Sequence, residues 1–188
     1  MRIAGGEYKG RVLKVPKSSK IRPSTEKTRE AIFSVLGGDI LDAKVADLFC
    51  GSGALGLEAL SRGAESALFV DLQPSSISIV KENIRALGLE LRASVMVKNA
   101  FSLRAANLDG IGIIFADPPY NMGYAERLVS LLSLQKSFWH GILILEHEPK
   151  WSYDGEKFEL AKRLEFGDSA VSFLLGPRES DERTASDD

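Results

Sequence analysis

The sequence predicts an α/β fold: a doubly wound, mostly parallel sheet that ends in an antiparallel hairpin. Between residues 45 and 145, short apolar runs alternate with segments of helical length, as in a parallel sheet covered by helices on both faces. A glycine-rich turn at residues 51–56 follows the first apolar run. The last two apolar runs are separated only by Gly167-Asp168-Ser169, which leaves no room for a crossover helix, so these strands should pair antiparallel.

The chain opens with a segment that predicts a small β-hairpin over residues 2–15, turned by three glycines. A helix is expected from about Thr25 to Leu36, because Gly37-Gly38 ends the helical pattern. Its apolar face is predicted to consist of Thr28, Ala31, Ile32, Val35 and Leu36.

Strands and helices then alternate along the chain. Five strands are expected at residues 45–49, 67–70, 94–97, 111–116 and 142–145. The helices between them are expected at residues 55–60, 75–87, 101–107 and 124–135. Pro74 and Gly88 bound the second of these, as proline and glycine commonly do. The closing hairpin should use residues 158–166 and 170–175.

Charge divides the chain into unequal parts. The net charge is −2, but residues 1–29 carry nine basic and two acidic residues, a balance of +7, which leaves −9 for the remainder. This asymmetry suggests a polyanion-binding arm, although a solvated hairpin whose lysines keep an edge strand soluble would look the same. We expect a basic hairpin extension at residues 1–20, a main domain at 21–176 and a disordered acidic tail at 177–188.

Several classes of protein are disfavoured by composition. The single cysteine, Cys50, rules out an intrachain disulfide and a cysteine-rich metal site, and is expected to be a small buried residue. His140 and His147 lie without other ligands at metal-binding spacing, so we expect no metal. With no leader-like start and no apolar run of membrane-spanning length, a cytoplasmic protein is expected.

The glycine turn predicts a cofactor site. Gly51, Gly53 and Gly56 form the pattern G-x-G-x-x-G between a strand and a helix, where backbone N–H groups can approach a ligand closely. Asp71 ends the second strand, twenty residues after Gly51, and can accept hydrogen bonds from ribose hydroxyls. A nicotinamide dinucleotide and S-adenosylmethionine both fit, since both carry an adenosine. The alternative is a tight turn with an unrelated surface acid.

The fourth strand runs into the tetrad Asp117-Pro118-Pro119-Tyr120. This loop favours S-adenosylmethionine over a nicotinamide dinucleotide as the cofactor. Its prolines lack N–H groups, so the loop is stiff and its carbonyls are free to accept. Asp117 and the Pro118 carbonyl can each accept one hydrogen of an exocyclic amino group on a nucleobase, while Tyr120 offers a face for stacking. This arrangement orients the nitrogen toward a sulfonium methyl group. The structural alternative is a proline-terminated strand with Tyr120 packed at its rim.

The segments DLFCGSGALG, FVD and DPPY occur in the order found in class I S-adenosylmethionine-dependent methyltransferases, which the chain resembles. More closely, it resembles the RsmD-type bacterial family, which methylates the N2 amino group of a guanine in 16S, or small-subunit, ribosomal RNA. RIAGGEYKGRVLKVP and IRPSTEKTREAIFSVL match that family's hairpin and helix, and FGDSAVSFL its closing hairpin. The resemblance covers residues 1–176.

The resemblance implies a seven-stranded sheet whose last strand inserts antiparallel, and it implies roles for particular residues. S-adenosyl-L-methionine would contact Asp47, Phe49, Gly51, Ser52, Gly53, Asp71, Leu72, Asn99 and Ala100. The target guanine would be held by Asp117, Pro118, Pro119 and Tyr120. Ribosomal RNA phosphates would be contacted by Arg2, Lys9, Arg11 and Arg22. Asn99 departs from the family, which usually carries an acid there to accept from the adenine amino group.

The resemblance further implies a monomer that acts on an assembled small ribosomal subunit, with no membrane partner. Three alternatives remain at this point. The tetrad also suits a methyltransferase acting on adenine N6 in RNA or DNA, the glycine turn suits a nicotinamide-dependent oxidoreductase, and the basic arm suits a non-catalytic RNA-binding assembly factor.

Overall fold

The computed structural model describes residues 1–16, 26–120, 122–134 and 141–176. The strands are β1 (Lys44–Leu48), β2 (Ser66–Asp71), β3 (Ala93–Val97), β4 (Ile113–Ala116), β5 (Ile142–His147), β6 (Glu159–Phe166) and β7 (Ser169–Leu175). The α-helices are α1 (Glu26–Leu36), α2 (Ala54–Ser61), α3 (Pro74–Leu87) and α4 (Tyr124–Leu134). Short 3-10 turns form η1 (Gly37–Ile40), η2 (Ala100–Ser102) and η3 (Ala105–Asn107).

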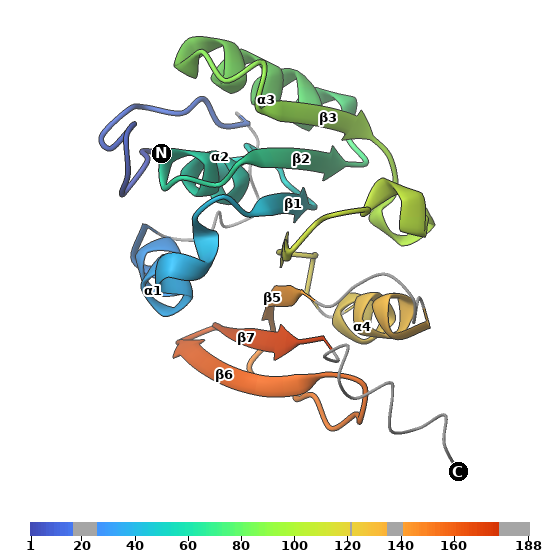
Figure 1. The fold of residues 1–188 in the computed structure, drawn as a ribbon. Coiled ribbons are helices and arrows are strands. Elements are labelled where there is room, and N and C mark those ends of the chain that lie inside the picture. The colour runs from blue at the N-terminus through green and yellow to red at the C-terminus, as the bar shows by residue number, and fades with distance from the viewer. Residues whose placement is uncertain (17–25, 121, 135–140, 177–188) are drawn as a thin grey trace.

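One seven-stranded sheet runs through the molecule in the order β3-β2-β1-β4-β5-β7-β6 (Figure 1). The first five strands are parallel, and β7 inserts antiparallel between β5 and β6. This confirms the doubly wound fold of class I methyltransferases with its antiparallel closing hairpin. The central strand β4 is buried at every position, as expected for a parallel strand covered on both faces.

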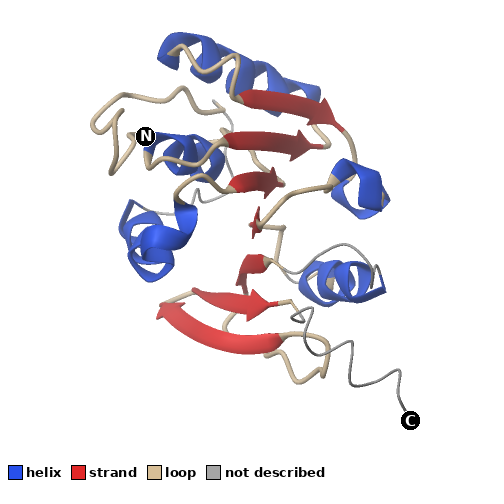
Figure 2. Cartoon of the chain, viewed as in Figure 1, coloured by secondary structure: helices blue, strands red, loops and turns tan. Residues whose placement is uncertain are grey.

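Alternate residues of the strands divide the core into two layers. On one face Val45, Phe69 and Phe115 pack against α1, α2 and α3. On the other face Leu48, Ile114 and Leu145 pack against α4 and the segment after β3. In Figures 1 and 2, α1 and α2 accordingly lie on one side of the strands and α4 on the other. Strands β1 to β5 and β7 contribute to both layers because their side chains point alternately to opposite faces.

The first fifteen residues form the predicted hairpin in outline. A single antiparallel bridge joins Arg2 to Val12, and the N–H of Leu13 donates to the carbonyl of Met1 over 2.9 Å. The turn lies directly on α2: the N–H of Glu7 donates to the carbonyl of Ser61 over 2.7 Å. We call residues 1–16 the N-terminal arm. Its predicted extension to residue 20 lies outside the described residues, as do Arg22, the helix start at Thr25 and the tail at 177–188.

Two local predictions were wrong. The buried face of α1 consists of Thr28, Arg29, Ile32, Phe33 and Leu36, whereas Val35 is 40 % exposed. Arg29 lies on the buried face because it pairs with Glu58 on α2. A count of apolar residues alone could not detect this pair. The helix predicted at residues 101–107 consists of the two turns η2 and η3.

Candidate active site

The site is built at the carboxyl edge of the parallel strands. β1 pairs in register with β2 and β4, and β4 pairs with β5, so the residues at the ends of these strands lie level with one another. Across the edge this gives one row, which consists of Asp71, Phe49, Asp117 and Glu146. Neighbouring parallel strands lie about 4.8 Å apart, so these residues share one small region. This is where open α/β sheets bind their ligands.

The glycine turn is tied directly to Asp71. The N–H of Gly51 donates to Asp71 Oδ2 over 2.9 Å, and the N–H of Gln73 donates to Oδ1 over 2.8 Å. Each carboxylate oxygen keeps further lone pairs for a ligand hydroxyl. Gly51 and Gly53 have φ angles of 52° and 77°, and a Cβ at Gly51 would meet no atom within 4 Å. The turn therefore leaves open space beside a fixed carboxylate, which suits a ribose.

Asp47 lies beneath the turn and supports it from inside the protein. Its Oδ2 accepts the N–H of Gly56 over 2.9 Å, and the residue is 3 % exposed. Burial, and to a smaller extent the charge of Asp71, raises the pKa of Asp47 to about 8, although the bond from Gly56 acts in the opposite direction. Gly56 must lack a side chain, because a Cβ there would collide with the ring of Phe69.

Aromatic and apolar side chains complete the side of the site next to β3. Phe49, with a φ of 59°, packs edge-on against Phe101 at 5.5 Å between ring centroids, and Tyr124 lies 5.0 Å from Phe101. Leu72, directly after Asp71, is 61 % exposed. An exposed leucine directly after the acid suits the flat face of an adenine.

Asn99 and Ala100 follow β3 at the same edge. Asn99 Oδ1 accepts the N–H of Phe101 over 3.0 Å and so caps the turn η2, while Ala100 is buried. A carbonyl oxygen has two lone pairs, so this bond leaves one available to an adenine amino group.

The Asp117–Tyr120 loop leaves β4 between the cofactor side and β5. Asp117 is half-buried and Pro118 is buried. The hydroxyl of Tyr120 donates to Glu146 Oε1 over 2.9 Å, and Ser169 hydrogen-bonds the same hydroxyl. Burial, together with the charges of Glu146 and Asp117, raises the pKa of Tyr120 well above its ordinary value, so the hydroxyl stays protonated. Its bonds orient the ring.

Glu146 is a site residue that the sequence analysis missed. It is 7 % exposed and stands near the end of the apolar run of β5. An acid at that position, in the run Ile142–His147, was a usable signal because the neighbouring strand ends in the acid Asp117. Its partner Tyr120 could not be identified without the fold.

Cys50 directly precedes the glycine turn but is not suited to act as a nucleophile. The Cys50 thiol is buried, and burial followed by the charges of Asp47 and Asp71 raises its pKa, which makes it a poor nucleophile. Within the described ranges, no cluster of histidine, cysteine and acids could hold a metal ion. The same residues include no helix long and apolar enough to cross a membrane.

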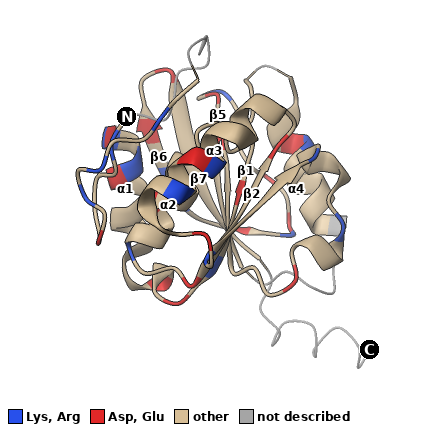
Figure 3. Cartoon of the chain, turned by 90° about the horizontal axis from the view of Figure 1, so that it is seen from above, with Lys and Arg blue, Asp and Glu red and all other residues tan. Residues whose placement is uncertain are grey.

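The predicted RNA-binding residues that the structure describes lie on the N-terminal arm and not in this row. Arg2, Lys9 and Arg11 are exposed on the N-terminal arm, which packs beside α2 and α3 (Figure 3). One nitrogen of Arg11 donates to the carbonyl of Ala86 at the end of α3 over 3.1 Å. Ser52 links the two regions, because its hydroxyl donates to Met1 Sδ over 3.8 Å.

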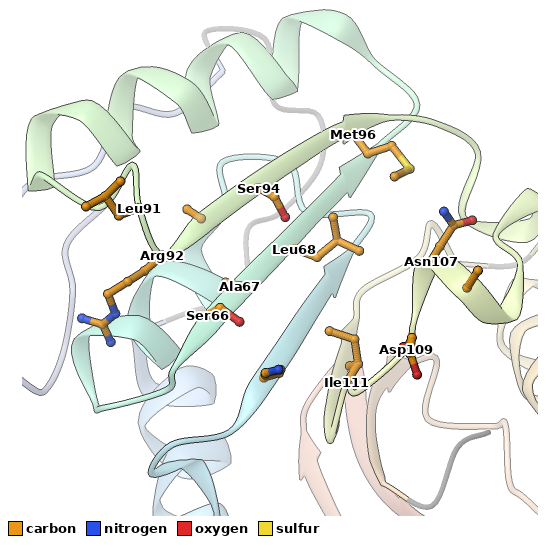
Figure 4. Close-up of a pocket in the computed structure, with 13 residues that line it drawn as sticks. Ser66, Ala67, Leu68, Leu91, Arg92, Ser94, Met96, Asn107, Asp109 and Ile111 are labelled. Carbon is orange, nitrogen blue, oxygen red and sulfur yellow. The ribbon is translucent and has the colours of Figure 1, made fainter.

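A separate groove of about 420 Å³ opens on the sheet face near the start of β2 (Figure 4). Leu68, Ser94 and Met96 line it from the sheet, and Asn107 and Ile111 from the segment before β4. It is open because the connection from β3 to β4 forms only short 3-10 turns and leaves this part of the face uncovered. None of the predicted site residues lines it.

Comparison with known sequences finds a match along most of the chain. The family described as "Conserved hypothetical protein 95" matches residues 1–175. Ribosomal RNA small subunit methyltransferase D of Escherichia coli K12 is 40 % identical over 132 residues, which cover 70 % of this chain and 66 % of that protein. The Bacillus subtilis protein YlbH is 38 % identical over 152 residues, covering 79 % of this chain and 83 % of the relative.

Solved structures of other proteins share the fold of this chain. The Escherichia coli protein yhhF superposes with a TM-score of 0.79 at 31 % identity and covers 95 % of this chain and 99 % of its own. An RNA methyltransferase from Salinibacter ruber, solved with S-adenosyl-L-homocysteine, has a TM-score of 0.65 at 13 % identity and covers 84 % of this chain and 95 % of its own. That second likeness concerns the fold alone. The resemblance stated from the sequence motifs is thereby confirmed.

Proposed function

The chain belongs to the conserved hypothetical protein 95 family, and from that membership we propose that it is an S-adenosylmethionine-dependent methyltransferase of small-subunit ribosomal RNA, acting on the N2 amino group of a guanine. A relative at 40 % identity carries the name ribosomal RNA small subunit methyltransferase D. The observation that carries the proposal is the Asp117–Tyr120 loop, which stands level with Asp71 and the glycine turn at one edge of the sheet.

The residues at that edge fit the cofactor. Asp71 would accept the ribose hydroxyls, and the glycine turn at Gly51, Ser52 and Gly53 would lie against the amino-acid portion with Asp47 behind it. Leu72, Phe49, Asn99 and Ala100 would surround the adenine. When bound, S-adenosylmethionine supplies a methyl group on a positively charged sulfur.

The loop after β4 would prepare the amino nitrogen for attack. The nitrogen's lone pair is delocalised into the guanine ring, so acceptors at Asp117 and the Pro118 carbonyl are needed to orient it and to favour the positive charge that develops. The nitrogen forms its bond to the methyl carbon as the carbon–sulfur bond breaks, and the sulfonium becomes a neutral thioether. The nitrogen then loses one proton to solvent, directly or by way of Asp117.

Tyr120 would hold the plane of the guanine. Its hydroxyl is bound to Glu146, which limits rotation of the ring and presents one fixed face beside Pro118 and Pro119. Stacking on an aromatic side chain is worth about 1–3 kcal/mol per base. An extruded base would thus be held on its face by Tyr120 and on its edge by Asp117.

RNA outside the pocket would be bound by the N-terminal arm. Arg2, Lys9 and Arg11 are exposed there, and Arg22 follows in the sequence. Contacts to phosphate supply affinity but little choice of sequence. In this proposal residues 1–20 form the RNA-binding extension, residues 21–176 the catalytic domain, and the protein acts in the cytoplasm as a monomer on an assembled small subunit.

The test is transfer of labelled methyl from S-adenosylmethionine to small ribosomal subunits from cells that lack this protein, followed by nucleoside analysis. We expect label in N2-methylguanosine. Asp117→Ala should lower the rate by roughly a hundredfold or more, the scale on which loss of one oriented polar contact lowers kcat. Asp154→Asn, an exposed acid in the loop before β6, serves as the matched control and should leave the rate unchanged.

The other outcomes distinguish the alternatives. Label in N6-methyladenosine would replace guanine by adenine as the target. Absence of label from both subunits and naked ribosomal RNA, in a protein that binds S-adenosylhomocysteine, would favour a non-catalytic RNA-binding factor. Equal rates for Asp117→Ala and the wild type would contradict the role given to the loop.

A further inference from the structure

Asn83 on α3 stands between the N-terminal arm and the cofactor turn. It is 2 % exposed. Its Nδ2 donates to the carbonyl of Ser52 over 3.1 Å and to the carbonyl of Lys14 over 3.0 Å. Its Oδ1 accepts the N–H of Lys14 over 2.8 Å. One buried amide therefore touches the glycine turn on one side and both backbone groups of an arm residue on the other.

These three bonds occupy both amide hydrogens and one lone pair of the oxygen. Displacement of Lys14 would leave the Asn83 carbonyl and one of its N–H groups without these partners in a buried place, and unmade bonds of buried polar groups are costly. The amide would then turn or admit water, and its bond to Ser52 would change as well. The arm and the glycine turn can thus shift together through this side chain.

Other contacts hold the arm in the same place. The Lys14 ammonium pairs with Glu82 over 2.7 Å on the surface of α3. The hydroxyl of Ser52 donates to Met1 Sδ over 3.8 Å, which is a second contact between the arm and the glycine turn. On α2, Glu58 Oε2 accepts the N–H of Ala4 over 3.3 Å. The arm is therefore docked along two helices whose N-terminal ends face the carboxyl edge of the sheet.

We propose that Asn83 is a positioning residue that couples the N-terminal arm to the cofactor turn, so that binding of cofactor and docking of the arm favour each other. The inference rests on the proposed function, because it takes the glycine turn as the cofactor site and the arm as the RNA-binding element. Such coupling is reciprocal: if the docked arm strengthens cofactor binding, bound cofactor strengthens docking by the same factor.

For the reaction, this coupling would make cofactor binding and RNA binding depend on each other. RNA phosphates that hold Arg2, Lys9 and Arg11 would keep Lys14 against Asn83, and the turn would be set in its binding shape when the substrate is present. Cofactor and RNA would then each bind more tightly in the presence of the other. A merely structural Asn83 would change stability without changing this mutual dependence.

The experiment measures hydrogen exchange over residues 9–16 of the full-length chain, with and without saturating S-adenosylhomocysteine, together with its dissociation constant by calorimetry. In the wild type we expect exchange in this segment to slow at least threefold on binding. Exchange at the β6–β7 turn, residues 166–169, should not change and serves as the internal reference.

Asn83→Ala should weaken S-adenosylhomocysteine binding about three- to tenfold and abolish the slowing in residues 9–16. Lys81→Ala is the matched control, since it truncates an exposed side chain two positions away on α3 and leaves the amide bridge in place. We expect it to retain both wild-type results. Asn83→Ser provides a second variant without the amide bridge, because a serine side chain is too short to reach both the arm and the turn.

The outcomes separate this inference from the proposed function. If S-adenosylhomocysteine binds the wild type but exchange in residues 9–16 is unchanged, the coupling is absent, and this result does not depend on any variant folding. If Asn83→Ala folds and keeps the wild-type slowing, Asn83 is not the link. If the wild type binds no S-adenosylhomocysteine, the proposed function fails and the coupling fails with it.

Discussion

At the scale of single residues, Asp47 shows how the site can set the ionisation of one group. The carboxyl is buried below the glycine turn, where water cannot stabilise its charge, and its pKa is raised to about 8. The folded protein therefore keeps a proton on Asp47 at pH values where the unfolded chain, with an ordinary pKa of 3.8, has lost it.

The sign of the pH dependence follows from proton counting. Between about pH 4 and pH 8 the folded state binds more protons at Asp47 than the unfolded state, so this group makes the free energy of unfolding fall as pH rises. Asp47→Asn cannot ionise, and its side-chain oxygen can still accept from Gly56. We expect the wild-type minus variant difference in unfolding free energy to decline by up to about 1.4 kcal/mol per pH unit.

Urea denaturation at pH 5, 6, 7 and 8 measures this difference. His147 acts oppositely, because burial lowers its pKa and stability is lost as pH falls below about 6.5. That contribution is present in both proteins and cancels in the difference. Parallel stability curves for the wild type and Asp47→Asn would show that Asp47 is ionised in the folded state.

At the scale of elements, α1 and the arm are joined to α2 through one buried carboxylate. Glu58 is fully buried, and its two oxygens accept from Arg29 Nε over 3.1 Å and from Arg62 Nη2 over 2.8 Å. Arg29 Nη2 also donates to the carbonyl of Arg2 over 2.7 Å. The guanidinium of Arg29 thus joins three segments, and α2, which begins at the glycine turn, is held from behind.

Arg29→Met should be strongly destabilising. It keeps the apolar length of the side chain but removes the cation that faces a buried acid, and breaking a buried pair from one side costs about 3–5 kcal/mol. Since Arg62 and the N–H of Ala4 remain at Glu58, we expect a loss of unfolding free energy of about 3 kcal/mol by urea denaturation.

The matched control for Arg29→Met is Lys44→Met, which breaks an exposed pair with Glu65 at 3.9 Å. Exposed pairs contribute about 0–1 kcal/mol, so this variant should remain near the wild type. A loss for Arg29→Met that is no larger than the control's would mean that the buried pair does not anchor α1.

At the scale of the whole molecule, the charge is divided along the chain. Residues 1–29 hold a balance of +7 and the remainder −9. In Figure 3 the N-terminus, where the arm begins, lies on the side of α1 and α2. Such a division would draw RNA phosphates toward the arm and away from the acidic remainder, and salt would weaken the attraction.

Replacing Lys9 and Arg11 together by glutamine should reduce the salt dependence of RNA binding. Each phosphate contact contributes about 0.7 to the slope of log affinity against log salt for single strands, so the double variant should have a slope shallower by about 1.4. Filter binding of naked 16S ribosomal RNA between about 50 and 200 mM salt measures it.

The matched double variant replaces Lys157 and Lys162 by glutamine, two exposed lysines before and within β6. It makes the same change of net charge at the far edge of the sheet. An equal reduction of the slope in both double variants would show that total charge, and not the arm, governs binding.

Local patterns in the sequence predicted the strands and the four α-helices in their order along the chain, together with the motifs at their ends. Periodicity, Gly51 and Gly53 at the turn, and the prolines after β4 act over a few residues, so their effects can be read locally. The antiparallel pairing of the last two strands was predictable as well, because three residues leave no room for a crossover helix.

Which distant side chains meet depends on the packing of the whole fold. Asn83 contacts Lys14 across 69 residues, Arg29 contacts Glu58 across 29, and Tyr120 contacts Glu146 across 26. None of these pairs has a spacing that helical or strand periodicity would bring together. They form because buried polar groups must find partners wherever packing has placed them, and that placement is a property of the whole fold.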